Sequence, residues 1–246
     1  MSVEYKIGDC LVLFRELKDE SVDLVLTDPP FGVSYDYETE GFKDYTGTQE
    51  YFLWVEKWFR EVRRVLKQNG VFLCFASPKY VREFLNIGAL CQFNYQEQII
   101  WDKVCAHSHN GPKRPLPNYE PCFFWSKGVD WTYNPPCQNV LRYVRHTAES
   151  GIKHKASRPV ELYAKLVSVF SNEDELVLDP FLGSGTTLLA CRMTNRNALG
   201  YEINPEYEPT IRERMHERVP DLFSFESEEE IEEQLGDREM NGDKVH

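Results

Sequence analysis

The chain has 246 residues, of which 41% are hydrophobic, and a formal net charge of −12. This length and apolar content support one buried core and exclude a disordered chain. The N-terminus lacks the basic and apolar regions of a signal peptide, and no apolar run reaches the ~18 residues needed to cross a bilayer. We therefore expect a soluble cytoplasmic protein with no membrane partner. Seven cysteines without a CxxC spacing indicate buried, reduced thiols.

Short apolar segments alternate along the chain with longer segments of helical period, which predicts an α/β fold with helices on both faces of one sheet. The expected strands cover residues 3–7, 23–27, 71–76, 98–101, 121–125, 175–178 and 198–202. The expected helices cover residues 52–66, a segment that begins at Pro159, residues 185–195 and residues 205–218. One domain thus spans residues 1–220, and residues 221–246 form an acidic tail that we expect to be solvated or disordered.

A first informative stretch, LVLTDPPFG, covers residues 24–32. An apolar strand runs here into an acid, two prolines, an aromatic ring and a glycine. Proline fixes φ and removes a backbone donor, so the acceptor groups of this turn are held on stiff backbone. Taken alone, the four residues DPPF also fit a rigid turn in which Asp28 caps a loop.

A second stretch, LVLDPFLGSGTT, is followed by a helical segment and a further strand. The first strand ends in Asp179, and the turn contains Gly183 and Gly185. Such glycines let a ligand approach the backbone, and a helix N-terminus attracts negative charge. Glu202 ends the next strand, where an acid can accept hydrogen bonds from ribose hydroxyls. Leu188 stands where a dinucleotide motif has its third glycine, which disfavours NAD and leaves another nucleoside cofactor or a plain turn.

The two stretches together resemble the amino-group DNA methyltransferases of the permuted beta class. Residues 179–187 are similar to the DPFxGSGTT cofactor turn of that family, and residues 28–31 to its D/N/S-P-P-Y/F catalytic motif. The catalytic motif comes first, which is the circularly permuted order. The resemblance implies a Rossmann-like methyltransferase fold with a seven-stranded, mostly parallel sheet, with DNA-recognition loops inserted at about 104–119 and 130–158.

Four shorter segments also resemble that family. Gly8-Asp9-Cys10 is similar to its acidic turn at the adenine end of the cofactor, IWDK at 100–103 to its Trp-x-Lys strand end, and YEP at 119–121 to its His-Glu-x segment. HKASRP at 154–159 is similar to its H-P-T-x-K-P segment, with three positions changed. The resemblance implies that this segment contacts the carboxylate of the cofactor's methionine part.

The resemblance implies S-adenosyl-L-methionine as cofactor and double-stranded DNA as partner. The catalytic residues implied are Asp28, Pro29, Pro30 and Phe31. The cofactor-binding residues implied are Asp9, Cys10, Asp28, Ser157, Arg158, Asp179, Pro180, Phe181, Gly183, Ser184, Gly185, Thr186, Thr187, Glu202 and Asn204.

The segment from 103 to 158 holds nine basic and three acidic residues in an otherwise acidic chain, which favours contact with DNA. The expected DNA-binding residues are His107, His109, Lys113, Arg114 and Tyr119. A merely soluble loop is the alternative. Cys105, His107 and His109 match no standard zinc spacing, so we expect no metal site.

The function implied is site-specific methylation of the exocyclic N6 of an adenine flipped out of duplex DNA. Asp28 at the first motif position favours adenine, with N4 of cytosine as the alternative and an inactive nucleic-acid-binding subunit as a further one. No Pro-Cys pair stands at the DPPF turn, so C5-cytosine chemistry is not expected. A homodimer and a cognate restriction endonuclease remain open as partners.

Overall fold

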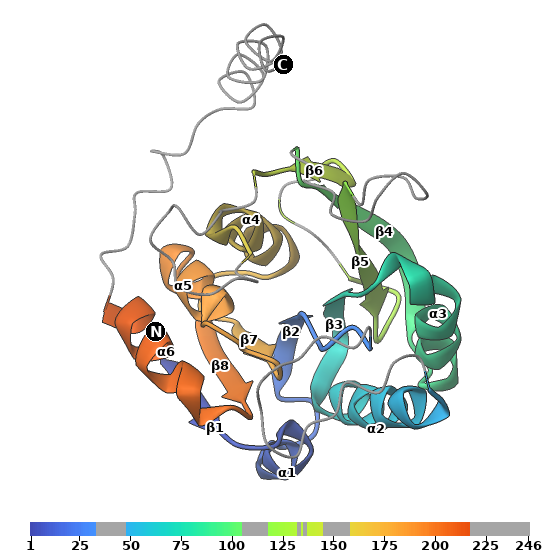
Figure 1. Cartoon of the computed structure of the whole chain (residues 1–246), viewed down its shortest axis with the longest axis horizontal. Coiled ribbons are helices and arrows are strands. Elements are labelled where there is room, and N and C mark those ends of the chain that lie inside the picture. Colours follow the sequence, from blue (N-terminus) through green and yellow to red (C-terminus); the bar gives the residue numbers. More distant parts are fainter. Residues whose placement is uncertain (33–47, 105–117, 132–133, 135–136, 145–157, 217–246) are drawn as a thin grey trace, which may run out of the picture.

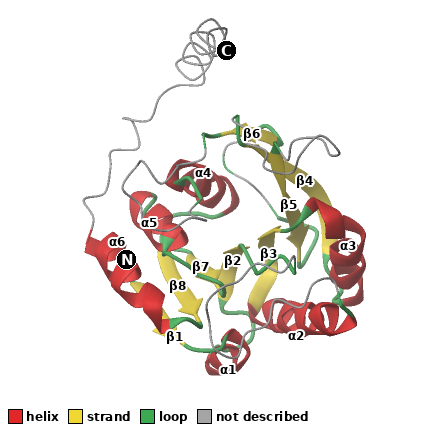
Figure 2. Ribbon diagram, in the orientation of Figure 1, coloured by secondary structure: helices red, strands yellow, loops and turns green. Residues whose placement is uncertain are grey.

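The computed structural model describes residues 1–32, 48–104, 118–131, 134, 137–144 and 158–216. One twisted sheet runs through the middle of these residues, with helices on both of its faces (Figure 1). Figure 2 shows the same three layers, with helices on either side of the strands. The predicted α/β fold with a sheet between two helical layers is confirmed.

Eight strands form the sheet among the described residues, in the order β1-β8-β7-β2-β3-β5-β4-β6. Neighbouring strands run parallel except at β5, which is antiparallel to both β3 and β4. The strands are β1 (Val3–Ile7), β2 (Val22–Thr27), β3 (Leu66–Phe75), β4 (Asn94–Asp102), β5 (Tyr119–Ser126), β6 (Val140–Arg142), β7 (Leu176–Asp179) and β8 (Asn197–Glu202).

Six α-helices in the described ranges divide between the two faces of the sheet. They are α1 (Cys10–Leu13), α2 (Gln49–Val65), α3 (Val81–Leu90), α4 (Val160–Phe170), α5 (Thr186–Met193) and α6 (Glu208–His216). Buried side chains of α1, α2 and α3 pack in one core cluster, and those of α4, α5 and α6 pack in the other. None of the helices in the described ranges is both long and apolar enough to pass through a lipid bilayer.

The helix α2 shows how the sequence produces these layers. Thr48 caps its N-terminus by accepting a hydrogen bond from the backbone N–H of Tyr51. Val55, Phe59 and Val62 follow at helical spacing and are fully buried against the sheet. The central strands are buried on both faces, as a sheet between two helical layers requires.

Two parts of the prediction need correction. The sheet has one strand more than the seven expected, because β6 forms three parallel pairs with β4 inside the segment 130–158 that was expected to be an inserted loop. The helix α3 was not expected at all. All seven predicted strands are present, with boundaries shifted by up to five residues.

Candidate active site

The two motif turns meet at one edge of the sheet. The strand β2 leads into Asp28, the strand β7 ends at Asp179, and the two strands are parallel neighbours. The hydroxyl of Thr27 donates a hydrogen bond of 2.7 Å to Oδ1 of Asp179 and so joins the strand ends directly. Ligands of open α/β sheets bind at the carboxyl ends of the strands, so this is the edge where a site is expected.

Asp179 is an internal brace of the glycine-containing turn. Its carboxylate also accepts hydrogen bonds from the hydroxyl of Thr187 and, at 3.1 Å, from the backbone N–H of Phe181. Burial raises the pKa of Asp179 to about 6, against the opposing effect of these donors. The side chain is nearly inaccessible to water. Its role is therefore to fix the turn and its register with β2.

The glycine-containing turn has a left-handed backbone with open space beside it, which would let a ligand approach closely. Gly183 and Gly185 have φ values of 55° and 89°, in the left-handed region that favours glycine. Apart from its two chain neighbours, no atom of the described residues would lie within 4 Å of a Cβ atom built on Gly183, so open space lies beside that backbone. Gly185 is the N-cap of α5, and Thr186 accepts a hydrogen bond from buried Arg214.

Glu202 contacts the same turn. Its carboxylate accepts hydrogen bonds of 2.7 Å from the backbone N–H of Gly183 and 2.8 Å from that of Asn204. Burial raises the pKa of Glu202 to about 7, and the two N–H groups oppose this shift. Each carboxylate oxygen has a second lone pair, so the two backbone bonds leave acceptor capacity for a ligand hydroxyl.

The turn after β1 lies beside Glu202. The backbone N–H of Gly8 donates to the carbonyl of Glu202 at 2.7 Å, and Asp9 caps the short helix α1 through the N–H of Leu11. Cys10 points into the core, and burial raises the pKa of its thiol. The structure therefore brings the Gly8-Asp9-Cys10 turn, the glycine-containing turn and the DPPF turn to one region. Asp9 is exposed at the border of this region.

Tyrosines from neighbouring elements fix the DPPF turn. The hydroxyl of Tyr51 donates to the carbonyl of Pro30 at 2.7 Å, and that of Tyr80 donates to the carbonyl of Gly32 at 3.1 Å. Pro29 is buried, and Phe31 packs partly against the core. The stiff backbone expected from the two prolines is thus braced from α2 and from the turn that precedes α3.

Asp28 forms an ion pair that the sequence did not predict. The guanidinium of Arg158 donates to Oδ1 of Asp28 at 2.6 Å and pairs with Glu120 at 2.6 Å. Glu120 in turn pairs with Lys103 at 2.7 Å. Burial raises the pKa of Asp28 to about 6, with Arg158 opposing and Glu120 adding to the shift. The network links β4, β5, the start of α4 and the DPPF turn.

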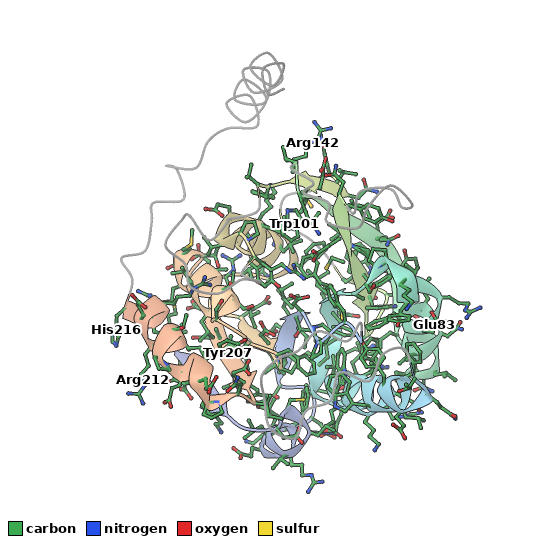
Figure 3. The ribbon with its side chains drawn as sticks, in the orientation of Figure 1. Glu83, Trp101, Arg142, Tyr207, Arg212 and His216 are labelled. Carbon is green, nitrogen blue, oxygen red and sulfur yellow. The ribbon has the colours of Figure 1, made fainter. Side chains whose placement is uncertain are left out.

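Three aromatic rings surround the Arg158 guanidinium. Its central carbon lies 5.0 Å from the ring centroid of Phe75, 5.2 Å from that of Trp101 and 5.7 Å from that of Phe31. Trp101, labelled in Figure 3, packs in the core cluster on the α4 side of the sheet. Cation–π attraction and exclusion of water therefore both hold the guanidinium in place.

Comparisons with known proteins show the family of the chain. The family model for DNA methylases of the N6/N4 type matches residues 22–213, which is most of the chain. The chain belongs to the N6/N4 DNA methylase family.

Relatives of this methylase include the type II methyltransferase M.BamHI of Bacillus amyloliquefaciens, at 29% identity over 87% of this chain. The match spans only 57% of the length of M.BamHI. The DNA adenine methyltransferase YhdJ of Escherichia coli (strain K12) is 27% identical, over 91% of this chain and 84% of YhdJ.

Two solved structures share the fold of this methylase. The PvuII DNA methyltransferase, described as cytosine-N4-specific, has a TM-score of 0.73 at 22% identity, over 99% of this chain and 94% of that chain. The complex of M1.HpyAVI with SAM has a TM-score of 0.69 at 24% identity, over 88% of this chain and all of that chain. The Rossmann-like methyltransferase fold expected from the motifs is confirmed.

Other residues that were predicted to bind the cofactor or DNA lie in several different parts of the methylase. Phe181 packs its ring against Trp54 and Trp58 of α2, so it anchors the turn to the core. Tyr119 begins β5 and is exposed. Five predicted residues lie outside the described residues: Ser157, His107, His109, Lys113 and Arg114. Within the described ranges, no group of three or more His, Cys, Asp or Glu side chains is arranged to hold a metal.

Sequence reasoning missed the three residues that complete the surroundings of the Asp28–Arg158 pair. Lys103 and Glu120 lie in the two short segments that resemble family motifs, but the resemblance assigned them no role. Phe75 ends β3 and carried no motif signal. Their arrangement depends on the antiparallel pairing of β5 with β3 and β4, which a single sequence does not reveal.

Proposed function

We propose that this protein transfers a methyl group from S-adenosyl-L-methionine to the exocyclic N6 of an adenine in double-stranded DNA. The observation that carries the proposal is the hydrogen bond between Thr27 and Asp179, which sets the DPPF turn beside the glycine-containing turn. One turn offers a carboxylate for an amino group, and the other offers a cradle for a nucleoside cofactor. Methyl transfer between two bound molecules needs this juxtaposition.

The chain's residues fit the cofactor in three respects. Open space lies beside the backbone of Gly183, where a side chain would otherwise stand. The buried carboxylate of Glu202 lies against the same turn and suits ribose hydroxyls. Asp9 at the end of β1 lies close to the end of β8. When bound there, S-adenosyl-L-methionine supplies a methyl group on a positively charged sulfur.

The amino group of adenine is a poor nucleophile because its lone pair is delocalised into the ring. Asp28 and the backbone carbonyl of Pro29 would accept hydrogen bonds from its two N–H groups and draw the nitrogen toward a tetrahedral geometry. After methyl transfer the nitrogen is positively charged and must lose one proton. Asp28, with a pKa raised to about 6, is suited to accept that proton and release it to water.

The target base must leave the double helix to reach Asp28. Flipping a nucleotide out of the stack costs a few kcal/mol, and stacking on an aromatic ring recovers part of that cost. Phe31, which is only partly buried and belongs to the same turn as Asp28, is the ring we propose for this contact. Rate enhancement then comes from orientation and electrostatics, without a covalent bond to the protein.

Methylation of cytosine N4 is the second candidate, and the fold shared with the cytosine-N4-specific PvuII enzyme favours it. The Asp at the first position of the DPPF turn favours adenine. The experiment is incubation of the full chain with methyl-labelled S-adenosyl-L-methionine and unmethylated genomic DNA, followed by digestion to nucleosides. Label in N6-methyladenine supports the proposal, label in N4-methylcytosine replaces it with the second candidate, and DNA binding without label points to an inactive subunit.

A further inference from the structure

Arg158 lies on the target-base half of the site. Its contacts to Asp28 and Glu120 are both 2.6 Å long, and its side chain is 11% exposed. The rings around it belong to Phe31, Phe75 and Trp101, which come from the DPPF turn, β3 and β4. These contacts place the guanidinium beside the residues proposed to hold the amino group. The sequence resemblance instead implied that the segment 154–159, to which Arg158 belongs, contacts the methionine carboxylate of the cofactor.

We infer that Arg158 is a positioning residue that orients the Asp28 carboxylate toward the target amino group, and that it is not a ligand of the cofactor carboxylate. The inference rests on the proposed function. Among the residues that the structure describes, the hydrogen bond to the Asp28 carboxylate comes from Arg158 and goes to Oδ1. With Oδ1 held, the carboxylate cannot rotate freely, and Oδ2 is the oxygen that remains for the base.

The guanidinium suits this task better than an ammonium group would. Nη2 of Arg158 meets Asp28 while Nη1 meets Glu120, so one planar fork spans two carboxylates in fixed geometry. Lys103 fixes Glu120 from its other side at 2.7 Å. Two cations and two carboxylates thus alternate, which compensates the charges that burial makes costly. A lysine at position 158 has the charge but lacks the fork.

Within the network, Arg158 favours the ionised form of Asp28. Burial alone would lower the pKa of Arg158, but Asp28 and Glu120 outweigh burial and raise it, so Arg158 stays charged. Its positive charge opposes the effect of burial on the pKa of Asp28. Without Arg158 that pKa would rise further, and ionisation of Asp28 would need a higher pH.

The test compares Arg158→Met and Arg158→Lys with Arg60→Met, a control at an exposed ion pair on α2. Calorimetry measures the affinity of each full-length variant for S-adenosyl-L-homocysteine, and single-turnover rates on unmethylated genomic DNA are measured across pH at saturating S-adenosyl-L-methionine. Arg158→Met should keep the affinity and lose about 100-fold in rate, as a misplaced reacting group does. The acidic limb of its rate profile should shift to higher pH. Arg158→Lys keeps the positive charge that Arg158→Met lacks, but its rate should remain well below that of the wild type.

Two results would overturn the inference. One is a loss of about tenfold or more in cofactor affinity with the rate at saturation retained, as expected for a lost charge-assisted bond to the cofactor. The other is wild-type activity in Arg158→Lys. If Arg158→Met unfolds, Glu120→Gln tests the same network from its second anchor, and it should lower the rate without lowering affinity. A wild-type protein that binds S-adenosyl-L-homocysteine but labels no DNA would refute the proposed function itself.

Discussion

Replacement of Thr27 by valine tests the joint between the two turns. Thr27 is fully buried, and its hydroxyl donates at 2.7 Å to the carboxylate of Asp179. A hydrogen bond to a charged group contributes about 1.5–3 kcal/mol, whereas a neutral one contributes about 1 kcal/mol. The pKa of Asp179 is raised to about 6, so its carboxylate is ionised at about pH 8 and largely protonated at about pH 5. We expect Thr27→Val to lower the free energy of unfolding by about 2–3 kcal/mol at the higher pH and by about 1 kcal/mol at the lower pH.

The sign follows from proton linkage. A carboxyl whose folded pKa exceeds its unfolded value binds more protons in the folded state, so stability falls as pH rises toward the folded pKa. Loss of the Thr27 hydroxyl raises that pKa further and extends the fall to higher pH. The free energies of unfolding of variant and wild type are compared at the same pH, so the contributions of other titrating groups cancel to first order.

The assay is urea unfolding of wild type and variant at the two pH values. Thr194→Val is the matched control, because Thr194 is also buried but its hydroxyl donates at 2.8 Å to the neutral carbonyl of Ala190. The control should lose about 1 kcal/mol at both pH values. An equal loss for Thr27→Val at both pH values would refute the idea that its hydroxyl stabilises an ionised Asp179.

Three further predictions concern the two halves of the site. Asp28→Ala should lower methyl transfer by at least about 100-fold and leave S-adenosyl-L-homocysteine affinity nearly unchanged in calorimetry, so a parallel loss of affinity would contradict this division of roles. Gly183→Val should lose that affinity at a cost of about 1–2 kcal/mol in stability, because its φ of 55° is left-handed and its side chain would enter the open space; unchanged affinity would place the cofactor elsewhere. The wild-type single-turnover rate should rise with pH around the Asp28 pKa of about 6, and a rate that is flat there would show that ionisation of Asp28 does not limit transfer.

The strand centres followed from the sequence, but some strand ends did not. The apolar runs of β2, β5 and β7 are buried on both faces and stand out in any reading of the chain. The structure extends β3 back to Leu66 and β4 back to Asn94, through residues with exposed polar side chains. Those ends exist because Leu66 pairs with Val22 and Asn94 pairs with Ser126. Cross-strand pairing therefore determines these strand ends, which the residue composition does not indicate.

The missed elements have a similar cause. The strand β6 has three residues, of which only Leu141 is buried. Three residues are too few to show the alternation of apolar and polar positions by which a strand is predicted from sequence. It exists because Val140 pairs with Ile100 at the edge of the sheet. The site shows the same limit. Both motifs were visible, but Arg158 contacts the DPPF turn together with three other segments, β3, β4 and β5.

Strand pairing also explains how a permuted motif order can leave the chemistry intact. Asp28 and Asp179 are far apart in sequence, yet the pairing of Leu24 with Val177 and of Val25 with Leu178 sets them at one sheet edge. The distance between the two turns thus depends on the β2–β7 ladder and on the Thr27 hydrogen bond, whatever the route of the intervening chain. That chain is free to carry additional segments, because the geometry of the two turns is set by hydrogen bonds between strands rather than by the connections that join them.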